Sequence, residues 1–378
     1  MGWRRIFWTL AVFLALSVLV IALTPQGRAG VKSLLFIPQI LPSIPIHPQE
    51  WFTGDPIRQD ISYPVPFGQG VADLYRPSNS GRHAAVLLFL GVNPAGRDDE
   101  RVVNLANALA RSGMVVMIPW SDTMTQKRVD PQEIDNLVAA FQYLRRLDSV
   151  DPKRVGMGGF CVGASLVTVA AQEPSIRDQV SFVNSFGGYY DAGGLIKTTV
   201  SRSAFYNDQI EPWQPDPLTV EVITRHLIEG LEDEPERQLL TRLFVAQEVG
   251  LALAPETLSP QALAVYKLLK GATLEDTEKL IESLPGATKK NLRRLSPSTN
   301  LESLKARILI MHDREDNLVP VGESRRLADA LDNRGGVYYT EFSFFQHVDP
   351  TRRVSPVVFV REASKLFLHL YRILRDTT

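Results

Sequence analysis

The sequence predicts an α/β protein with a doubly wound, mostly parallel sheet. Short, continuously apolar runs, typical of strands covered on both faces, alternate with amphipathic helical patterns. Two further observations add parts to this fold. One region contains only helical patterns, separated from one another by Gly or Pro, and an uncharged apolar run lies near the N-terminus. We therefore expect a transmembrane anchor over residues 1–30 and a Pro-rich apolar tether over 31–50. The α/β core follows in two segments, 51–205 and 297–378, with a helical cap insertion over 206–296 between them.

Composition excludes some classes of function. The formal net charge is −1 and 22% of the residues are charged, so electrostatics give no reason to expect a nucleic-acid partner. The single cysteine excludes an intrachain disulfide and a multi-thiolate metal site. The six histidines show no paired metal-ligand spacing. We therefore expect no metal site.

Residues 6–23 are predicted to form a membrane-spanning helix. Only Thr9 and Ser17 are polar in this run, and at about 1.5 Å per residue it reaches roughly 27 Å, close to the ~30 Å of a bilayer core. Arg4 and Arg5 favour a cytoplasmic N-terminus, which would place the following domain on the extracytoplasmic side. A cleaved signal peptide is the alternative, although the run is long for one and no clear cleavage site follows. We expect a single-pass protein held in the bilayer by this run.

The next segment is predicted to be an apolar tether that forms no second span. Prolines forbid a continuous helix there, at Pro38, Pro42, Pro45 and Pro48. Two positions remain open for it, along the bilayer surface or packed on the domain.

The body is predicted to contain six strands of the central sheet, separated by helices. The clearest helical pattern covers 132–147, with Asp130 and Pro131 at its start. An antiparallel hairpin over 62–75 is expected at the edge of the sheet, with two prolines in its first strand. The six expected strands cover 85–90, 114–118, 154–157, 180–184, 308–312 and 337–342.

Cys161, the only cysteine, lies in a pattern typical of a nucleophile. A strand is followed by Gly-x-Cys-x-Gly and a helix, so Cys161 would occupy a strained, sharp turn in which Gly159 and Gly163 avoid collisions. The thiol would then be exposed at the carboxyl end of the sheet, beside a helix N-terminus that stabilises negative charge. The alternative is a buried structural cysteine. Ser165, the nearest hydroxyl, is expected to be a packing residue.

Asp316 and His347 are the candidates for orienting acid and base. Asp316 follows the strand that ends near His312 and leads into the next helix, so its carboxylate would reach beyond the strand end; a helix cap is the alternative role. His347 lies in a loop before the last helix. The order nucleophile, acid, histidine is the one expected for such a turn. His369, the rival base, lies on an apolar helical stripe and is expected to be packed there.

Two backbone groups are expected to bind the oxyanion that forms during acyl transfer. One is the N–H of Val162, directly after the candidate nucleophile. The other is the N–H of Val92, because Gly91 ends the strand before it and permits close approach. Neither contribution depends on a side chain.

Three runs resemble the α/β-hydrolase superfamily, in particular its dienelactone hydrolase-like branch with a cysteine in the elbow: "GGFCVGAS", "MHDREDNLVP" and "FFQHVDPT". The resemblance covers about 63–375. It implies an α/β-hydrolase fold with helices on both faces of the sheet, no cofactor, and a triad of Cys161, His347 and Asp316. The helical insertion, which looks like a cap or lid, and the membrane anchor depart from the compact soluble members.

The expected function is therefore that of a membrane-anchored hydrolase. It would cleave a small-molecule ester or lactone through a thioester acyl-enzyme. Two alternatives remain: a catalytically silent protein of the same fold that binds a ligand, and an acyltransferase that uses the same triad.

Overall fold

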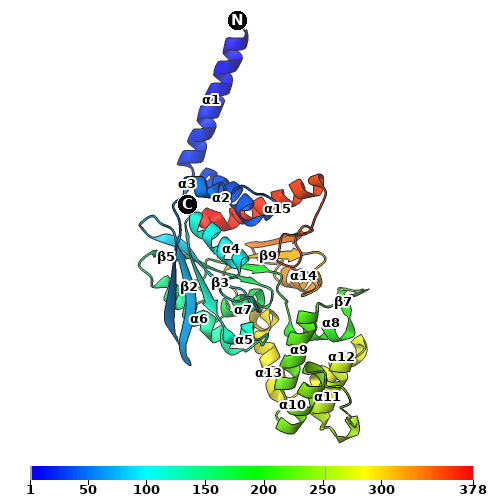
Figure 1. The fold of residues 1–378 in the computed structure, drawn as a ribbon. Coiled ribbons are helices and arrows are strands. Elements are labelled where there is room, and N and C mark those ends of the chain that lie inside the picture. The colour runs from blue at the N-terminus through cyan, green and yellow to red at the C-terminus, as the bar shows by residue number, and fades with distance from the viewer. Residues whose placement is uncertain (1, 252, 378) are drawn as a thin grey trace.

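The computed structural model describes residues 2–251 and 253–377 and contains an eight-stranded central sheet (Figure 1). Its strands are β1 (Ile57–Val65), β2 (Gly68–Arg76), β3 (His83–Phe89), β4 (Met114–Trp120), β5 (Val150–Phe160), β6 (Phe182–Phe186), β9 (Arg307–Asp313) and β10 (Val337–Phe342). The order across the sheet is β1-β2-β4-β3-β5-β6-β9-β10. The strands from β4 to β10 are parallel, whereas β1 and β2 are antiparallel to their neighbours. The predicted mostly parallel sheet is confirmed.

Helices cover both faces of this sheet (Figure 1). One face packs against α6 (Gln132–Arg145) and α7 (Val162–Ala170), and the other against α4 (Glu100–Arg111) and α15 (Pro356–Leu374). Successive residues of β4 alternate between the two cores: Val115 belongs to the first and Val116 to the second. Because side chains of a strand point to opposite faces, a strand with two covered faces is apolar throughout. The remaining core helices are α3 (Gln49–Phe52), α5 (Asp122–Thr125) and α14 (Val321–Asp329).

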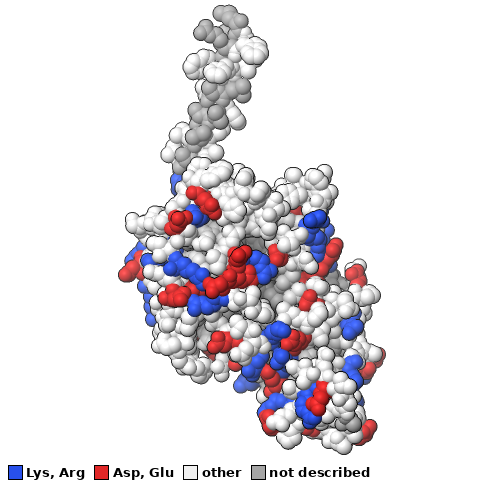
Figure 2. Space-filling view, viewed as in Figure 1, with Lys and Arg blue, Asp and Glu red and all other residues white. Residues whose placement is uncertain are grey.

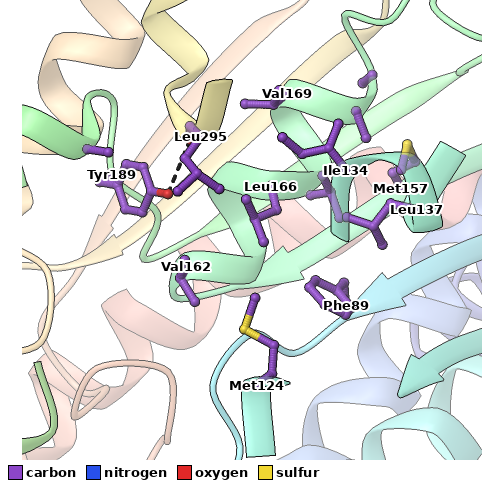
Figure 3. Close-up of a cluster of buried hydrophobic side chains, with 14 of the residues drawn as sticks. Phe89, Met124, Ile134, Leu137, Met157, Val162, Leu166, Val169, Tyr189 and Leu295 are labelled. Carbon is purple, nitrogen blue, oxygen red and sulfur yellow. Dashed lines mark hydrogen bonds between the residues drawn. The ribbon is translucent and has the colours of Figure 1, made fainter. Parts of the chain in front are cut away.

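The helix that follows Cys161 is embedded in the larger core. Val162 and Leu166 of α7 lie among buried side chains that include Phe89 (Figure 3). At one end of the cluster the hydroxyl of Tyr189 donates a hydrogen bond of 3.2 Å to the carbonyl of Leu295. The start of α7 is therefore held by packing on several sides.

The insertion between β6 and β9 projects to one side of the sheet (Figure 1). It comprises α8 (Ala192–Ser201), β7 (Ser203–Tyr206), β8 (Gln209–Pro212), α9 (Pro217–Glu229), α10 (Glu234–Leu240), α11 (Pro260–Lys270), α12 (Leu274–Glu282) and α13 (Gly286–Leu295). The prediction of an all-helical insertion over 206–296 is wrong at its start, because β7 and β8 form an antiparallel hairpin. Its turn has Asn207 at φ 52°, and asparagine is a residue that hairpin turns favour at positive φ.

The N-terminal helix α1 (Gly2–Leu23) extends away from the body (Figure 1). The side chains of α1 that the structure describes are uncharged, whereas acidic and basic side chains are interspersed over the body (Figure 2). Large apolar side chains on it are exposed, Trp3 by 91% and Phe13 by 70%.

The described helices do not include a membrane-spanning one. No helix in the part of the chain that the structure describes has the length and apolarity needed to cross a bilayer. The transmembrane helix predicted over 6–23 is therefore not confirmed. Some α1 side chains lie outside the described residues, including the two arginines used to predict the orientation: Arg4, Arg5, Leu10, Ala11, Leu14, Ala15, Val18 and Ala22.

The predicted tether is largely helical and belongs to the body. Helix α2 (Pro25–Ile40) is capped by the hydroxyl of Thr24, which accepts the N–H of Gly27 at 3.0 Å. Pro38 lies in its last turn, where it removes one backbone N–H without preventing the helix. The helix ends at Ile40, because Leu41 precedes Pro42 and is extended, as residues before proline usually are. The buried Phe36 packs with the core formed by α4 and α15. Of the two positions left open for this segment, packing on the domain is the one observed.

Candidate active site

Cys161 occupies a strained turn between β5 and α7. Its backbone has φ 55° and ψ −136°, a region that residues other than glycine rarely adopt and that costs about 1–3 kcal/mol. The strain is held by backbone hydrogen bonds: the N–H of Cys161 donates to Phe186 at 2.9 Å, and its carbonyl accepts from Ala164 at 3.0 Å. The half-buried thiol thus lies at the carboxyl end of the sheet, at the N-terminus of α7.

The glycines around Cys161 permit close backbone contacts. A Cβ atom on Gly159 would lie 2.4 Å from the carbonyl oxygen of Gly163, and one on Gly163 would lie 2.6 Å from the nitrogen of Gly91. Gly91 itself has φ 72°, and a Cβ there would lie 2.9 Å from the carbonyl oxygen of Phe160. The glycine spacing is therefore a steric requirement of the turn and of the neighbouring loop.

We expect Gly159→Ala to destabilise the protein and to impair its activity. The added methyl group would meet backbone atoms, which cannot move aside as a side-chain tip can, so the free energy of unfolding should fall by about 1–3 kcal/mol. Urea unfolding and the turnover of an ester measure the two effects. Gly335→Ala is the matched control, because a methyl group there meets nothing within 4 Å. Equal stability of the two variants would contradict this account of the turn.

Asp316 and His347 form a short, buried pair. Nδ1 of His347 donates to Oδ2 of Asp316 at 2.6 Å, and Oδ1 of Asp316 accepts the N–H groups of Leu318 at 2.8 Å and Val319 at 3.1 Å. Burial alone would raise the pKa of Asp316, but the charge of His347 and hydrogen bonds hold it well below its usual range. Burial alone would lower the pKa of His347, but the Asp316 carboxylate raises it well above 6.5.

His347 also faces Cys161. Its Nε2 is buried and has no hydrogen-bond partner among the described residues, and Cys161 is one of the groups that raise the pKa of His347. Both side chains line the same cavity. Gly187 leaves room for the ring, because a Cβ there would lie 3.1 Å from Cε1 of His347 and 3.6 Å from Oδ2 of Asp316. The structure thus brings together the three predicted side chains from the turn between β5 and α7, the β9–α14 loop and the loop after β10.

The loop that carries Asp316 is braced by buried polar contacts. His312, at the end of β9, shares a hydrogen bond with Oγ of Ser324 at 2.6 Å and another with the carbonyl of Val319 at 2.9 Å. The indole N–H of Trp213, from the insertion, donates to the carbonyl of Asp316 at 2.9 Å. These contacts fix the loop in the position at which the Asp316 carboxylate can bind the His347 imidazole.

Asp313 and Arg352 position His347, a role that the sequence analysis missed. Oδ2 of Asp313 accepts the backbone N–H of His347 at 3.1 Å. The guanidinium of Arg352 binds both carboxylate oxygens of Asp313 at 2.9 Å, and the carboxylate is fully buried. Asp313 was visible as a carboxylate at a strand end, but nothing local in the sequence indicates Arg352 as its partner.

We expect Arg352→Gln to lower kcat about 10- to 100-fold with little change in KM. Losing the bidentate pair releases Asp313 and lets the His347 loop shift, and small displacements of a catalytic group cost rate more than binding. Steady-state kinetics on an ester provide the measurement, with thermal unfolding to verify that both proteins are folded. Arg353→Gln removes the same charge from the exposed neighbouring residue. A comparable kcat loss in that control would overturn the positioning role.

The rival residues are engaged elsewhere. Oγ of Ser165 is buried in α7, where it donates to the carbonyl of Tyr189 at 2.9 Å and accepts its N–H at 2.8 Å. His369 is buried on α15 and shares a hydrogen bond of 2.8 Å with Asn184, and burial lowers its pKa to about 3. Neither is oriented by a carboxylate as His347 is.

The two predicted oxyanion donors lie in adjoining segments. Val162 is the first residue of α7, so its N–H has no acceptor within the helix. The loop with Gly91 and Val92 lies against it, since a Cβ on Gly91 would be 2.9 Å from Cγ1 of Val162. Val92 also lines the cavities beside Cys161.

Two cavities meet at Cys161. One, of about 80 Å³, lies between the core and the insertion and is lined by residues of α9 and α13, among them Ile223 and Leu295. The other, of about 600 Å³, lies between the sheet and the layer of α2, α4 and α15. Val92 and Leu318 border both. A substrate carbonyl at the sulfur would therefore have room on two sides.

Comparison with known proteins identifies the fold. Similar solved structures include an acylaminoacyl peptidase of Pyrococcus horikoshii, with a TM-score of 0.52 and 13% identity over 85% of this chain and 42% of that one. Another is a puromycin-hydrolyzing peptidase of Mycobacterium tuberculosis, with a TM-score of 0.51 and 15% identity over 84% of this chain and 39% of that one. The chain has the α/β-hydrolase fold. It spans about two-fifths of the length of these peptidases, and the identity is low enough that the likeness concerns the fold alone.

The sequence comparisons give one family match. The sequence model of the dienelactone hydrolase family matches residues 120–201, which include β5, Cys161 and α7. The matched stretch does not extend to Asp316 or His347. No curated protein matches the chain.

Proposed function

We propose that the protein is a hydrolase that cleaves a carboxylic ester or lactone with Cys161 as nucleophile, His347 as base and Asp316 as the group that orients the base. One observation carries the proposal: an imidazole with Nδ1 paired to a buried carboxylate at 2.6 Å and an unpaired Nε2, beside a cysteine in a strained strand-to-helix turn. A base held in one tautomer by a carboxylate and next to a nucleophile is the arrangement that acyl transfer requires.

In the first step the thiol proton passes to Nε2 of His347 while the sulfur attacks the carbonyl carbon. The Asp316 carboxylate stabilises the imidazolium that forms. The backbone N–H groups of Val92 and Val162 stabilise the negative carbonyl oxygen. The carbon–oxygen bond then breaks, the proton moves from His347 to the leaving alkoxide, and a thioester remains on Cys161.

In the second step water replaces the alcohol. Neutral His347 takes a proton from the water as its oxygen attacks the thioester carbonyl. The carbon–sulfur bond breaks, and the proton on Nε2 returns to the Cys161 sulfur. One ester and one water have then become one acid and one alcohol, with the enzyme unchanged and no cofactor required.

The family match supports an ester or lactone as the substrate class, since its region contains the cysteine turn. The two solved structures described above are named as peptidases, so a peptide substrate is the alternative that the experiment must include. Acyl transfer to an alcohol and ligand binding without turnover are two further outcomes.

A substrate panel on the purified full-length chain tests the proposal. It contains p-nitrophenyl acetate, a simple lactone and an acetylated amino-acid p-nitroanilide, with and without an added alcohol acceptor. We expect ester or lactone hydrolysis and, on rapid quenching, a mass increase of one acyl group on the peptide that contains Cys161. Absence of turnover and of acylation would refute the proposal, and products formed only with the acceptor would identify an acyltransferase.

We also propose that residues 6–23 hold the protein at a lipid bilayer, with the N-terminus cytoplasmic and the hydrolase domain extracytoplasmic. The exposed apolar side chains of α1 support this, because exposed apolar patches of this kind mark contact surfaces. We expect the full-length chain in the membrane fraction after a high-salt wash, and the double variant Phe13→Asp, Leu16→Asp in the soluble fraction. Recovery of the unaltered chain in the soluble fraction would contradict the proposal that residues 6–23 bind a bilayer.

A further inference from the structure

The larger cavity follows the sheet away from the reacting sulfur. It begins at Cys161 and His347, and its lining includes residues from both ends of β6, Phe186 and Phe182. The five residues of β6 cover roughly 13 Å at about 3.3 Å per residue, so the cavity is elongated along the strand. Its volume of about 600 Å³ lies within the range of roughly 300–1,000 Å³ typical of ligand sites.

The walls of this cavity are predominantly apolar. Strands, α15 and the loop before His347 all contribute large hydrocarbon or aromatic side chains, among them Leu88, Leu90, Phe160, Phe345, Leu370 and Ile373. The lining also contains polar side chains, most of them paired with one another or with the protein: Asn184 pairs with His369, Asn104 with Gln39, and Arg101 with Asp99 at 2.7 Å and Asp349 at 2.9 Å. A ligand in the cavity would therefore gain most from burying apolar surface.

The N-terminal segment completes the walls. Phe36 and Ile40 of α2, and Leu41, Ile44 and Pro45 after it, line the cavity. The segment is fastened to the body on both sides, by the pair of Gln39 and Asn104 and by Gln49, whose side chain donates to Oγ of Ser112 at 2.8 Å. The part of the chain predicted to be a mere tether thus forms one wall of the cavity.

We propose that this cavity holds the acyl chain of the substrate, so that the preferred substrates are esters of fatty acids with about ten or more carbon atoms. The inference rests on the proposed hydrolase function and names its substrate class. An elongated apolar space that begins at the nucleophile fits a linear hydrocarbon. The acyl group is the part that stays on the sulfur through both steps, so it gains most from an enclosed cavity, while the smaller cavity under the insertion is left for the alcohol.

Chain-length dependence tests the inference directly. The full-length chain, at one fixed concentration of a nonionic detergent, is assayed with p-nitrophenyl esters of acids from C2 to C16. We expect kcat/KM to rise roughly threefold to fourfold per added methylene until the cavity is filled, with a C10 ester favoured over the C2 ester by at least 100-fold. A profile that is flat or falls from C2 would overturn the inference while leaving the hydrolase proposal intact. No turnover with any ester would instead refute the proposed function.

A variant that fills the cavity gives the second arm. We expect Ile44→Trp to lower kcat/KM for the C10 ester at least 10-fold and to leave the C2 ester within twofold, because the added ring would occupy cavity space that a ten-carbon chain needs and a two-carbon chain does not. Ile46→Trp is the matched control, since Ile46 is 53% exposed and does not line the cavity. Leu370→Trp repeats the test from α15 and is used if the first variant unfolds at a lower temperature.

The acyl assignment has its own control. Acetate esters of linear alcohols from C2 to C10 place the hydrocarbon on the leaving group instead. We expect little dependence on the length of the alcohol. A strong preference for long alcohols that Ile44→Trp abolishes would show that the cavity holds the leaving group, and would overturn the assignment made here.

Discussion

Replacing Cys161 with alanine is expected to reduce ester hydrolysis by about 10⁴-fold or more, to the level that binding and the oxyanion donors alone supply. Cys161 is the only cysteine in the chain, and its turn presents the sulfur at the meeting point of two cavities. Without the sulfur no thioester can form, and His347 has no proton to take from a nucleophile. The measurement is kcat on the best ester of the panel, together with mass analysis of the quenched enzyme.

The matched control is Ser165→Ala, which removes the nearest hydroxyl. Because Oγ of Ser165 satisfies the buried N–H and carbonyl of Tyr189, we expect this variant to lose about 1–3 kcal/mol of stability and to keep kcat within a few-fold. If Cys161→Ala retained its activity and Ser165→Ala lost it, the nucleophile would be the hydroxyl and the assignment of Cys161 would be wrong.

Asp316→Asn is expected to lower kcat about 10³- to 10⁴-fold. The amide cannot stabilise the imidazolium, and it can donate to Nδ1 and so impose the wrong tautomer on His347. The pKa of His347 should fall in the variant, because the carboxylate is what raises it above 6.5 against the effect of burial. Titration of the His347 ring by NMR and the pH dependence of kcat report this change. Protonation of the leaving alkoxide needs the protonated His347 ring. The decline of kcat with rising pH should therefore begin at a lower pH in the variant than in the unaltered enzyme.

The same pair gives stability a defined pH dependence. The pKa of His347 is raised on folding, so its contribution is fully present below about pH 6.5 and is lost as the pH rises through the folded-state value. The pKa of Asp316 is lowered on folding, so its contribution is present above about pH 4 and is lost as the pH falls towards the folded-state value. Asp316→Asn should therefore cost the most stability between about pH 4 and 6.5.

Urea unfolding at several pH values measures this difference. Asp332→Asn is the control, because it makes the same substitution at an exposed aspartate far from the pair in the sequence. We expect the control to unfold like the unaltered protein at every pH. A constant difference between Asp316→Asn and the unaltered chain from pH 4 to pH 9 would mean that the pair does not titrate as described.

Local patterns predicted much of the core. The expected strand 114–118 lies within β4, because a strand covered on both faces must be apolar at nearly every position, and that is visible without any partner. The expected strand 337–342 has the bounds of β10, an edge strand in which valine, tyrosine and phenylalanine, residues that strands favour, stand beside Thr340 and Glu341. The hairpin of β7 and β8 was missed because two four-residue strands give too short an alternation to stand out among helices. The turn residue Asn207 was the available signal.

The N-terminal segment shows where local patterns mislead. Four prolines between residues 31 and 48 argue against a helix, yet α2 reaches Ile40 with Pro38 in its last turn. The apolar residues of this segment, for which both the bilayer surface and the domain were open as contacts, are buried against the domain, among them Phe36 and Ile37. Hydropathy reports that a side chain avoids water and does not report which apolar surface covers it.

By itself the sequence determined the alternation of strands and helices and the presence of a strained cysteine turn, because both depend on residues within one turn or one strand of each other. Only the tertiary structure decided which carboxylate meets His347, that Arg352 and Asp313 hold its loop, and that the N-terminal segment forms a wall of the large cavity. Those relations join residues far apart in the chain, and their distances are set by how the sheet, the insertion and the outer helices pack together.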